Sequence, residues 1–296
     1  MIDKCTTKSW ETSLYEPQQL YYNLMGEKIL TDKNVKSAYY MAKHKKSCDS
    51  PAWDGMTRTI LVDGMEPEHA WSLIRYHVLH GPSGCVKRFD IPKSNGKTRP
   101  ISIYPLLDRV AQWCIMEPLR KACGPLLSPI NHAFLKGKSC KTAFEAFPPA
   151  GEASYVICGD IHSFFDTVSH SLVRACLWSA GIRDSQLLHT INVTLKTPYK
   201  YPKQPKVRPE QGLPQGAPIS PLLANIILAY MDRYFVSLYG DQKLPRMVRY
   251  ADDFVIFCTD RKQAMTVQAQ MTWFIKYRLR LDLAPEKTYL VNLKQK

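Results

Sequence analysis

Two adjacent aspartates interrupt an apolar stretch near the C-terminal end of the chain. The segment 247–258 reads as two short strands, and Asp252 and Asp253 stand between them, where a tight turn normally uses Gly or Asn. Two carboxylates at one turn repel each other, and a divalent cation with oxygen ligands offsets that repulsion. The pair therefore predicts a metal-binding turn, although an ordinary solvated hairpin turn would look the same in isolation.

A third acid lies at the end of another apolar run. Asp160 closes the segment 155–161, whose composition is typical of a buried strand. If this strand and the acidic hairpin share one sheet, their three carboxylates can hold two metal ions. The alternative role for Asp160 is the N-cap of the helix expected to follow it through Leu177.

Glycines and prolines shape the segment 211–218, which opens a helix expected over 222–234. Such a loop lets the backbone approach a substrate closely. Upstream, the segments 85–91 and 99–103 flank an Asn-Gly pair and predict a β-hairpin. Further helices are expected at 66–79, 107–121 and 264–281.

The order of these elements predicts an α+β fold, because strands and helices alternate without a regular parallel period. The sequence Pro-Pro-Ala-Gly at 148–151 is the clearest break, so we place a domain boundary between 1–150 and 151–296. The segment 197–210 holds four prolines and three lysines, which predicts an exposed basic loop.

The charge balance favours a polyanionic partner. Forty Lys and Arg against 26 Asp and Glu give a formal net charge of +14, which attracts nucleic acid or marks a protein of high pI. The nine cysteines include no Cys-x-x-Cys pair and predict reduced thiols. The N-terminus has no signal-peptide pattern and no segment resembles a membrane span, so we expect a cytoplasmic protein without a membrane partner.

Six short motifs follow one another along the chain, at 54–56, 91–100, 159–166, 211–216, 250–253 and 283–288. Taken in order, they resemble the motifs of the reverse transcriptase family. The resemblance is closest to its bacterial branch of group II intron-encoded and defence-associated, retron-like enzymes. It implies a right-hand polymerase, with an N-terminal extension and fingers over 1–150, a palm over 151–296, and a missing or minimal thumb.

The resemblance also assigns roles to single residues. It implies that Asp160, Asp252 and Asp253 are the catalytic carboxylates and, with the backbone carbonyl of Ile161, bind two Mg²⁺ ions. The deoxynucleotide would be held by a further set of residues. In this set Lys93 and Arg99 grip the triphosphate, Phe165 excludes a 2′-hydroxyl, Gln215 shapes the pocket, and Lys287 donates a proton to pyrophosphate.

The implied function is RNA-directed DNA synthesis by two-metal nucleotidyl transfer, with an RNA template, a DNA primer and product, and dNTPs. Only 289–296 follow the last motif, and Ala133-Phe134-Leu135 stands where intron enzymes tend to have Gly-Phe-Arg. We therefore favour a dedicated noncoding RNA in an antiphage defence system. A fragment of an intron mobility enzyme, an idle RNA-binding scaffold and an untemplated DNA polymerase stay open. Because no thumb is recognised, a structured RNA or a second protein copy is expected to close the site. The intact acids argue against a scaffold, and Phe165 argues against an RNA-synthesising relative.

Overall fold

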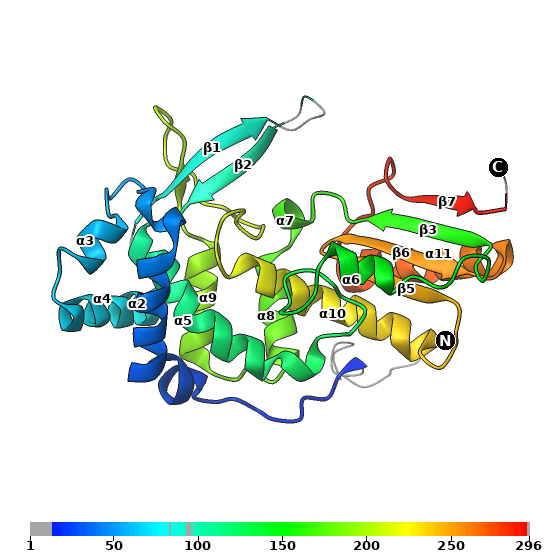
Figure 1. Ribbon diagram of the computed structural model, residues 1–296, viewed down its shortest axis with the longest axis horizontal. Helices are drawn as coiled ribbons and strands as arrows, with labels where there is room; N and C mark the ends of the chain where they lie inside the picture. The colour runs from blue at the N-terminus through cyan, green and yellow to red at the C-terminus, as the bar shows by residue number, and fades with distance from the viewer. Residues whose placement is uncertain (1–13, 83, 93–95, 97, 295–296) are drawn as a thin grey trace, which may run out of the picture.

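The computed structural model describes residues 14–82, 84–92, 96 and 98–294, so Lys93 lies outside the described part of the chain. Helices and two sheets alternate (Figure 1), which confirms the mixed helix-and-sheet character predicted from the sequence. The helices are α2 (Asp32–His44), α3 (Arg58–Val62), α4 (Pro67–His80), α5 (Leu106–Ala122), α6 (Cys140–Glu145), α7 (Phe164–Thr167), α8 (His170–Ser179), α9 (Ser185–Leu195), α10 (Ser220–Tyr239) and α11 (Arg261–Trp273). Short 3-10 or π-helical turns are η1 (Met25–Ile29), η2 (Lys46–Asp49), η3 (Gly124–Leu126) and η4 (Phe274–Arg278).

A four-stranded antiparallel sheet lies on the right of Figure 1. Its register places Asp160 directly opposite Asp253. The strand expected at 155–161 and the two strands around the acidic turn are therefore confirmed, and they share one sheet. Its order is β5 (Arg246–Tyr250), β6 (Asp253–Cys258), β3 (Tyr155–Asp160) and β7 (Tyr289–Asn292).

The two faces of this sheet are covered differently. Ile157 and Phe254 belong to the main apolar core, to which α10 and α11 also contribute. Alternate side chains of a strand point to opposite faces. Val156 and Phe257 accordingly face the other way and pack with Phe147, just beyond α6. This second face is the more thinly covered one.

The predicted hairpin consists of β1 (Val86–Pro92) and β2 (Thr98–Ile103), which project away from the helices (Figure 1). Gly96 in its turn has a φ of 76°, a conformation that glycine adopts freely. The strand β4 (Tyr199–Lys200) adds to β1 in parallel. Beyond β4 the segment 201–210 is mainly exposed, so the basic loop is confirmed apart from this short strand.

Three of the predicted helices differ in their bounds from those of the structure. The helix α10 begins at Ser220 and ends at Tyr239, which makes it longer than expected at both ends. The helix α11 begins at Arg261, because the Asp260 side chain caps it by accepting a hydrogen bond from the backbone NH of Gln263 at 2.9 Å. The helix expected after Asp160 is divided into α7 and α8, since Ser169 starts the second one as its N-cap.

One cluster of buried apolar side chains extends from Tyr15 to Leu281 and so draws on both sides of residue 150. The helices α4 and α9, from opposite sides of that position, pack on each other. Within the described ranges, no helix combines the length and the apolar character needed to cross a membrane.

Candidate active site

The acidic residues meet where β3 ends beside the β5–β6 turn. Asp160 is only 6% exposed, and its side chain shares a hydrogen bond with Asp253. Burial, this hydrogen bond, and the charges of Asp160 and Asp252 raise the pKa of Asp253 to about 6, against a smaller opposite effect of Lys287. The shared hydrogen bond and the raised pKa mark a site with more negative charge than its surroundings readily accept.

Lys287 supplies a positive charge to this site. Its Nζ atom donates to Oδ2 of Asp160 at 2.7 Å, and this bond raises the pKa of the Lys287 ammonium. The preceding backbone is attached to the same strand, because the NH of Ala284 donates to the carbonyl of Asp160 at 2.8 Å. Ile161 is fully buried, and its backbone pairs with Leu283 as an isolated bridge.

The donor set suits a hard divalent cation, which prefers carboxylate oxygens. Burial and the neighbouring acids raise the pKa of Asp253, and a cation held between the carboxylates would relieve that repulsion. In the described part of the chain, no group of three His, Cys, Asp or Glu side chains is already gathered as a metal site. The carboxylates of Asp160 and Asp253 therefore suit a divalent cation in charge and in donor type. Asp252 is the neighbouring residue of the turn.

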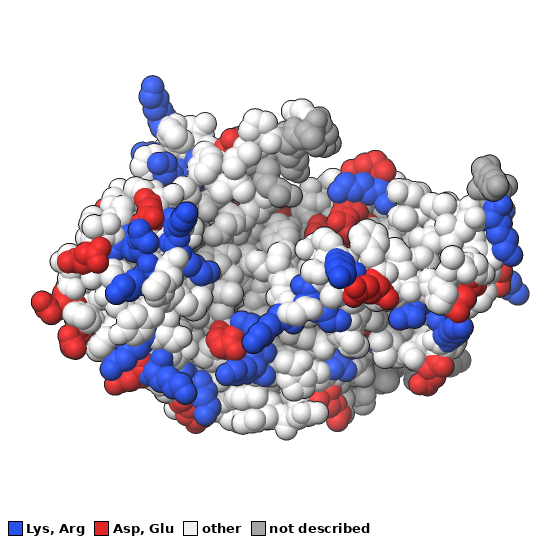
Figure 2. All heavy atoms as spheres, viewed as in Figure 1, with Lys and Arg blue, Asp and Glu red and all other residues white. Residues whose placement is uncertain are grey.

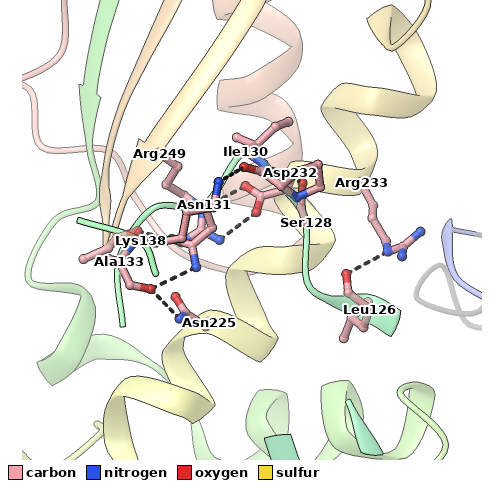
Figure 3. A network of polar contacts seen from close by, with 12 residues as sticks. Leu126, Ser128, Ile130, Asn131, Ala133, Lys138, Asn225, Asp232, Arg233 and Arg249 are labelled. Atoms are coloured by element: carbon pink, nitrogen blue, oxygen red, sulfur yellow. Dashed lines mark hydrogen bonds and ion pairs between the residues drawn. The ribbon is translucent and has the colours of Figure 1, made fainter. Parts of the chain in front are cut away.

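The acidic turn has an unusual backbone. Tyr250 pairs with Asp253, so Ala251 and Asp252 form a two-residue loop. Ala251 has a φ of 58°, in the left-handed region that costs a non-glycine residue about 1 kcal/mol. Arg249, two residues before Ala251, has a side chain only 1% exposed and forms an ion pair with the buried Asp232 of α10 (Figure 3).

Sequence reasoning missed this buried ion pair. A signal was present, since Asp232 follows the apolar run 226–231 inside a helix. An acid in such a place is rarely buried without a partner. Its partner on β5 could not be identified from the pattern alone, because many basic residues lie elsewhere in the chain.

The loop 211–218 is fixed between α7 and β2. The NH of Leu213 donates to the carbonyl of Phe165 at 2.6 Å, and the NH of Ser102 donates to the carbonyl of Gln215 at 2.9 Å. Gly216 has a φ of 105°, and a Cβ atom there would lie 2.2 Å from the carbonyl oxygen of Ser102. Only glycine fits this close approach, so the loop needs its glycine for backbone contact with the hairpin.

The residues expected at the site are divided between two cavities. Phe165 and Gln215 line one of about 330 Å³. Asp160, Asp253 and Lys287 line another of about 520 Å³, on the thinly covered face of the sheet. Figure 2 shows an indentation of the surface between the hairpin and this sheet, with acidic and basic side chains together on its sheet side.

The side chains of the other two candidates, Lys93 and Arg99, are not described by the structure. The backbone of Arg99 pairs with Ile91 in the hairpin, and its side chain lies outside what the structure describes. Lys93 is also outside the described residues.

An acid pair at a strand end, an acidic hairpin beside it and a glycine-dependent loop fit a metal-dependent nucleotidyl-transfer enzyme. Residues 91–296 match the family model described as reverse transcriptase (RNA-dependent DNA polymerase). The chain therefore belongs to the reverse transcriptase family, a family of RNA-directed DNA polymerases that generally use divalent metal ions.

Relatives support the predicted bacterial branch. Protein YkfC of Escherichia coli K12 is 27% identical over 285 residues, covering 84% of this chain and 74% of that protein. The group II intron-encoded protein LtrA of Lactococcus lactis is 26% identical, covering 71% of this chain and 45% of LtrA. The retron Mx162 reverse transcriptase of Myxococcus xanthus is 28% identical, covering 58% and 36% respectively. The chain thus spans less than half of the last two relatives.

Proposed function

We propose that this protein extends a DNA primer along an RNA template, with Asp160, Asp252 and Asp253 as ligands of two Mg²⁺ ions. The observation that carries the proposal is the strand register that places Asp160 directly opposite Asp253, beside the acidic turn. Bound Mg²⁺ would activate the primer 3′-hydroxyl and stabilise the leaving pyrophosphate. The backbone carbonyl of Ile161 is the further ligand in this proposal.

The deoxynucleotide is assigned to the cavity lined by Phe165 and Gln215. The ring of Phe165 is partly buried against the core, which restrains it as a steric barrier to a 2′-hydroxyl. Lys93 and Arg99 of the hairpin would bind the triphosphate. Lys287 would donate a proton to pyrophosphate, a role that its position beside Asp160 supports, because its Nζ lies 2.7 Å from Oδ2 of that acid.

The proposed enzyme has the right-hand division of a polymerase. The sheet that carries the acids would be the palm, within 151–296, and the β1–β2 hairpin would belong to the fingers, within 1–150. The bond between Ser102 and Gln215 supports this arrangement, because it joins the hairpin to the loop beside the nucleotide cavity. The cavity of about 520 Å³ next to the acids would receive the primer end.

A structured RNA is the proposed partner, and a basic groove supports it. Two further cavities, of about 530 and 720 Å³, adjoin one another. Asn192 and Lys196 line both of them, and Arg208 lines the larger one as well as the nucleotide cavity. Among the described residues, no Asp or Glu lines either of these two cavities. We call these two cavities the basic groove, defined by the cations Arg174, Lys196, Lys206 and Arg208.

The similarity to retron reverse transcriptases supports a dedicated noncoding RNA as template. Its use in antiphage defence is the biological role that we propose. Sequencing of the nucleic acid that copurifies from the native host tests the first point, since one RNA and its complementary DNA should dominate. Copurified intron RNA would instead favour a mobility role of the kind that the similarity to LtrA suggests. Phage plating on host cells that carry the Asp252→Asn variant tests the role in defence.

Primer extension by Asp252→Asn tests the activity itself. The variant should lose at least about 1,000-fold in kcat while it folds and binds RNA like the wild type, because a metal ligand acts mainly on the transition state. Asp241→Asn, an exposed aspartate in the loop before β5, is the matched control and should keep full activity. A variant at position 252 that extends primers at the wild-type rate would exclude the two-metal assignment.

A further inference from the structure

The side chain of Arg249 lies in the core between β5 and α10. Its Nε donates to Oδ1 of Asp232 at 2.8 Å, and its Nη2 donates to Oδ2 of the same carboxylate at 2.6 Å. Both side chains are essentially excluded from solvent, at 1% and 0% exposure (Figure 3). A buried pair of this kind is weak evidence for stability, since apolar residues of similar volume often serve as well. Stability alone therefore does not explain the pair.

The remaining nitrogen of the guanidinium points to the acidic turn. Nη1 of Arg249 donates to the carbonyl oxygen of Ala251 at 2.8 Å. Ala251 is the residue with a φ of 58°, and it directly precedes Asp252 and Asp253. A strained conformation of this type persists only where the surroundings determine it. The charged hydrogen bond from Arg249 is such a determinant, because it fixes the peptide plane that leads into Asp252.

The backbone of Arg249 is fixed as well. Its NH donates to the carbonyl of Ile130 at 3.0 Å, and its carbonyl accepts from the NH of His132 at 2.9 Å. The segment around Asn131 thus lies along β5, the outer strand of the sheet. Asn225 of α10 ties the same segment down, since its side-chain nitrogen donates to the carbonyl of Ala133 at 2.9 Å (Figure 3).

We propose that the Arg249–Asp232 pair is a positioning device for the acidic turn. It transmits the fixed position of α10 and β5 to the peptide of Ala251, and so sets the direction in which Asp252 and Asp253 are presented. Arg249 itself is too deeply buried to meet substrate. The proposal rests on the function given above, in which these two acids act at the reacting centre and small displacements reduce the rate.

The decisive variant replaces both members of the pair. Arg249→Met with Asp232→Leu leaves no buried charge and should keep the thermal midpoint within a few degrees of the wild type, yet it removes the donor to Ala251. We expect kcat of primer extension to fall about 10- to 100-fold with KM for dNTP changed less than about threefold, as for lost orientation. Amide hydrogen exchange over 250–254 should become faster. Arg249→Lys should also lose kcat, because one ammonium cannot reach all three acceptors in a fixed fork.

Arg233 provides the matched control. It lies next to Asp232 on α10 and donates to the carbonyl of Leu126 at 3.0 Å, away from the turn (Figure 3). Arg233→Met should keep the wild-type kcat and the wild-type exchange rate over 250–254. A folded double variant with wild-type kcat and unchanged exchange in the turn would overturn the positioning role. If the proposed function itself is wrong, the wild-type protein will extend no primer. The exchange measurement would still decide the role of the pair in that case.

Discussion

The ammonium nitrogen of Lys287 lies 2.7 Å from Oδ2 of Asp160, and it joins a residue of the last motif to the end of the central strand 127 positions earlier. The lysine is more than half exposed, whereas the aspartate is almost buried, at 59% and 8% of their side-chain surfaces. Lys287 can therefore leave the pair for solvent more easily than Asp160 can. This asymmetry suits a lysine that neutralises the acid when no cation is present and moves when one binds.

Lys287→Met should lower kcat of primer extension by about 100-fold or more, because a general acid typically contributes about 100- to 10,000-fold. Its effect on the free energy of unfolding should stay below about 1 kcal/mol, because the lysine is exposed and water screens the pair. Pairing raises the pKa of Lys287, so this stabilisation is fully present at neutral pH and is lost only as pH rises through the raised pKa. Single-turnover kinetics and thermal melts at pH 7 and at alkaline pH test both parts.

A comparable ion pair away from the site serves as its control. Nζ of Lys243 donates to Oε1 of Glu152 at 2.7 Å, at a place where the proposed chemistry needs no charge. Lys243→Met should resemble Lys287→Met in stability but keep the wild-type kcat. Equal loss of activity in the two variants would contradict a specific role for Lys287.

Asp253→Asn should raise the thermal midpoint of the metal-free protein above pH 6. The pKa of Asp253 is raised to about 6, so the folded state binds more protons than the unfolded chain between about pH 4 and 6. Wild-type stability therefore falls as pH rises through that window, and the neutral asparagine escapes the fall. We expect a gain of about 1–3 °C at pH 8, none near pH 3.5, and loss of polymerase activity.

Thermal melts with a chelator and with Mg²⁺ measure this prediction. Because a cation offsets the repulsion in the wild type, Mg²⁺ should stabilise the wild type more than the variant. An Asp253→Asn protein less stable than the wild type at pH 8 without metal would mean that the acids do not repel each other in the fold.

Local patterns were enough to predict the elements that carry the acids. The apolar runs around Asp160 and Asp252 have strand length and composition, and the Asn-Gly pair defines the hairpin, so these elements are the predicted ones. The sequence also led to the family through its motifs, which the comparison confirms. The catalytic and binding roles of single residues stay predictions.

Features that depend on contacts far apart in the chain were not predictable in this way. Arg249 and Asp232 are 17 positions apart on different elements, and only the packing of α10 under the sheet brings them together. The strand β7 has four residues and exists because β3 offers it an edge. The division of the site into two cavities likewise follows from how the hairpin meets the loop before α10, which no local pattern encodes.

Phe165→Ala should relax the choice of sugar, since the ring is assigned to exclude a 2′-hydroxyl from the cavity that Gln215 also lines. We expect the ratio of dNTP to rNTP incorporation to fall by at least about tenfold, with less change in dNTP use, because removing a steric clash acts on discrimination. Phe144→Ala removes an exposed ring at the other cavity and should leave the ratio unchanged. An unaltered ratio for Phe165→Ala would place the sugar barrier on another residue.

Reversal of charge in the basic groove tests the RNA partner. Lys196 and Lys206 line adjoining parts of this groove, and Lys196→Glu with Lys206→Glu would place two acids on the path assigned to phosphates. Each lost phosphate contact should lower the slope of log affinity against log salt by about 0.7 to 0.9, so the double variant should lose about 1.5 units of slope. Filter binding of the copurified RNA over a range of salt concentrations measures the slope.

A control with the same net charge separates the groove from the overall field. Lys262→Glu with Lys276→Glu reverses two exposed lysines of α11 and η4, and it lowers the net charge by the same four units. If the groove binds the RNA, the slope of log affinity against log salt falls only in the groove variant. Light scattering should then show the groove variant without bound RNA and the control variant with it. Activity on a generic primed template should fall little in either variant, because neither pair lines the cavity beside the acids. Equal loss of RNA affinity in both variants would mean that the +14 charge acts as a general field and that RNA has no preferred binding place in the basic groove.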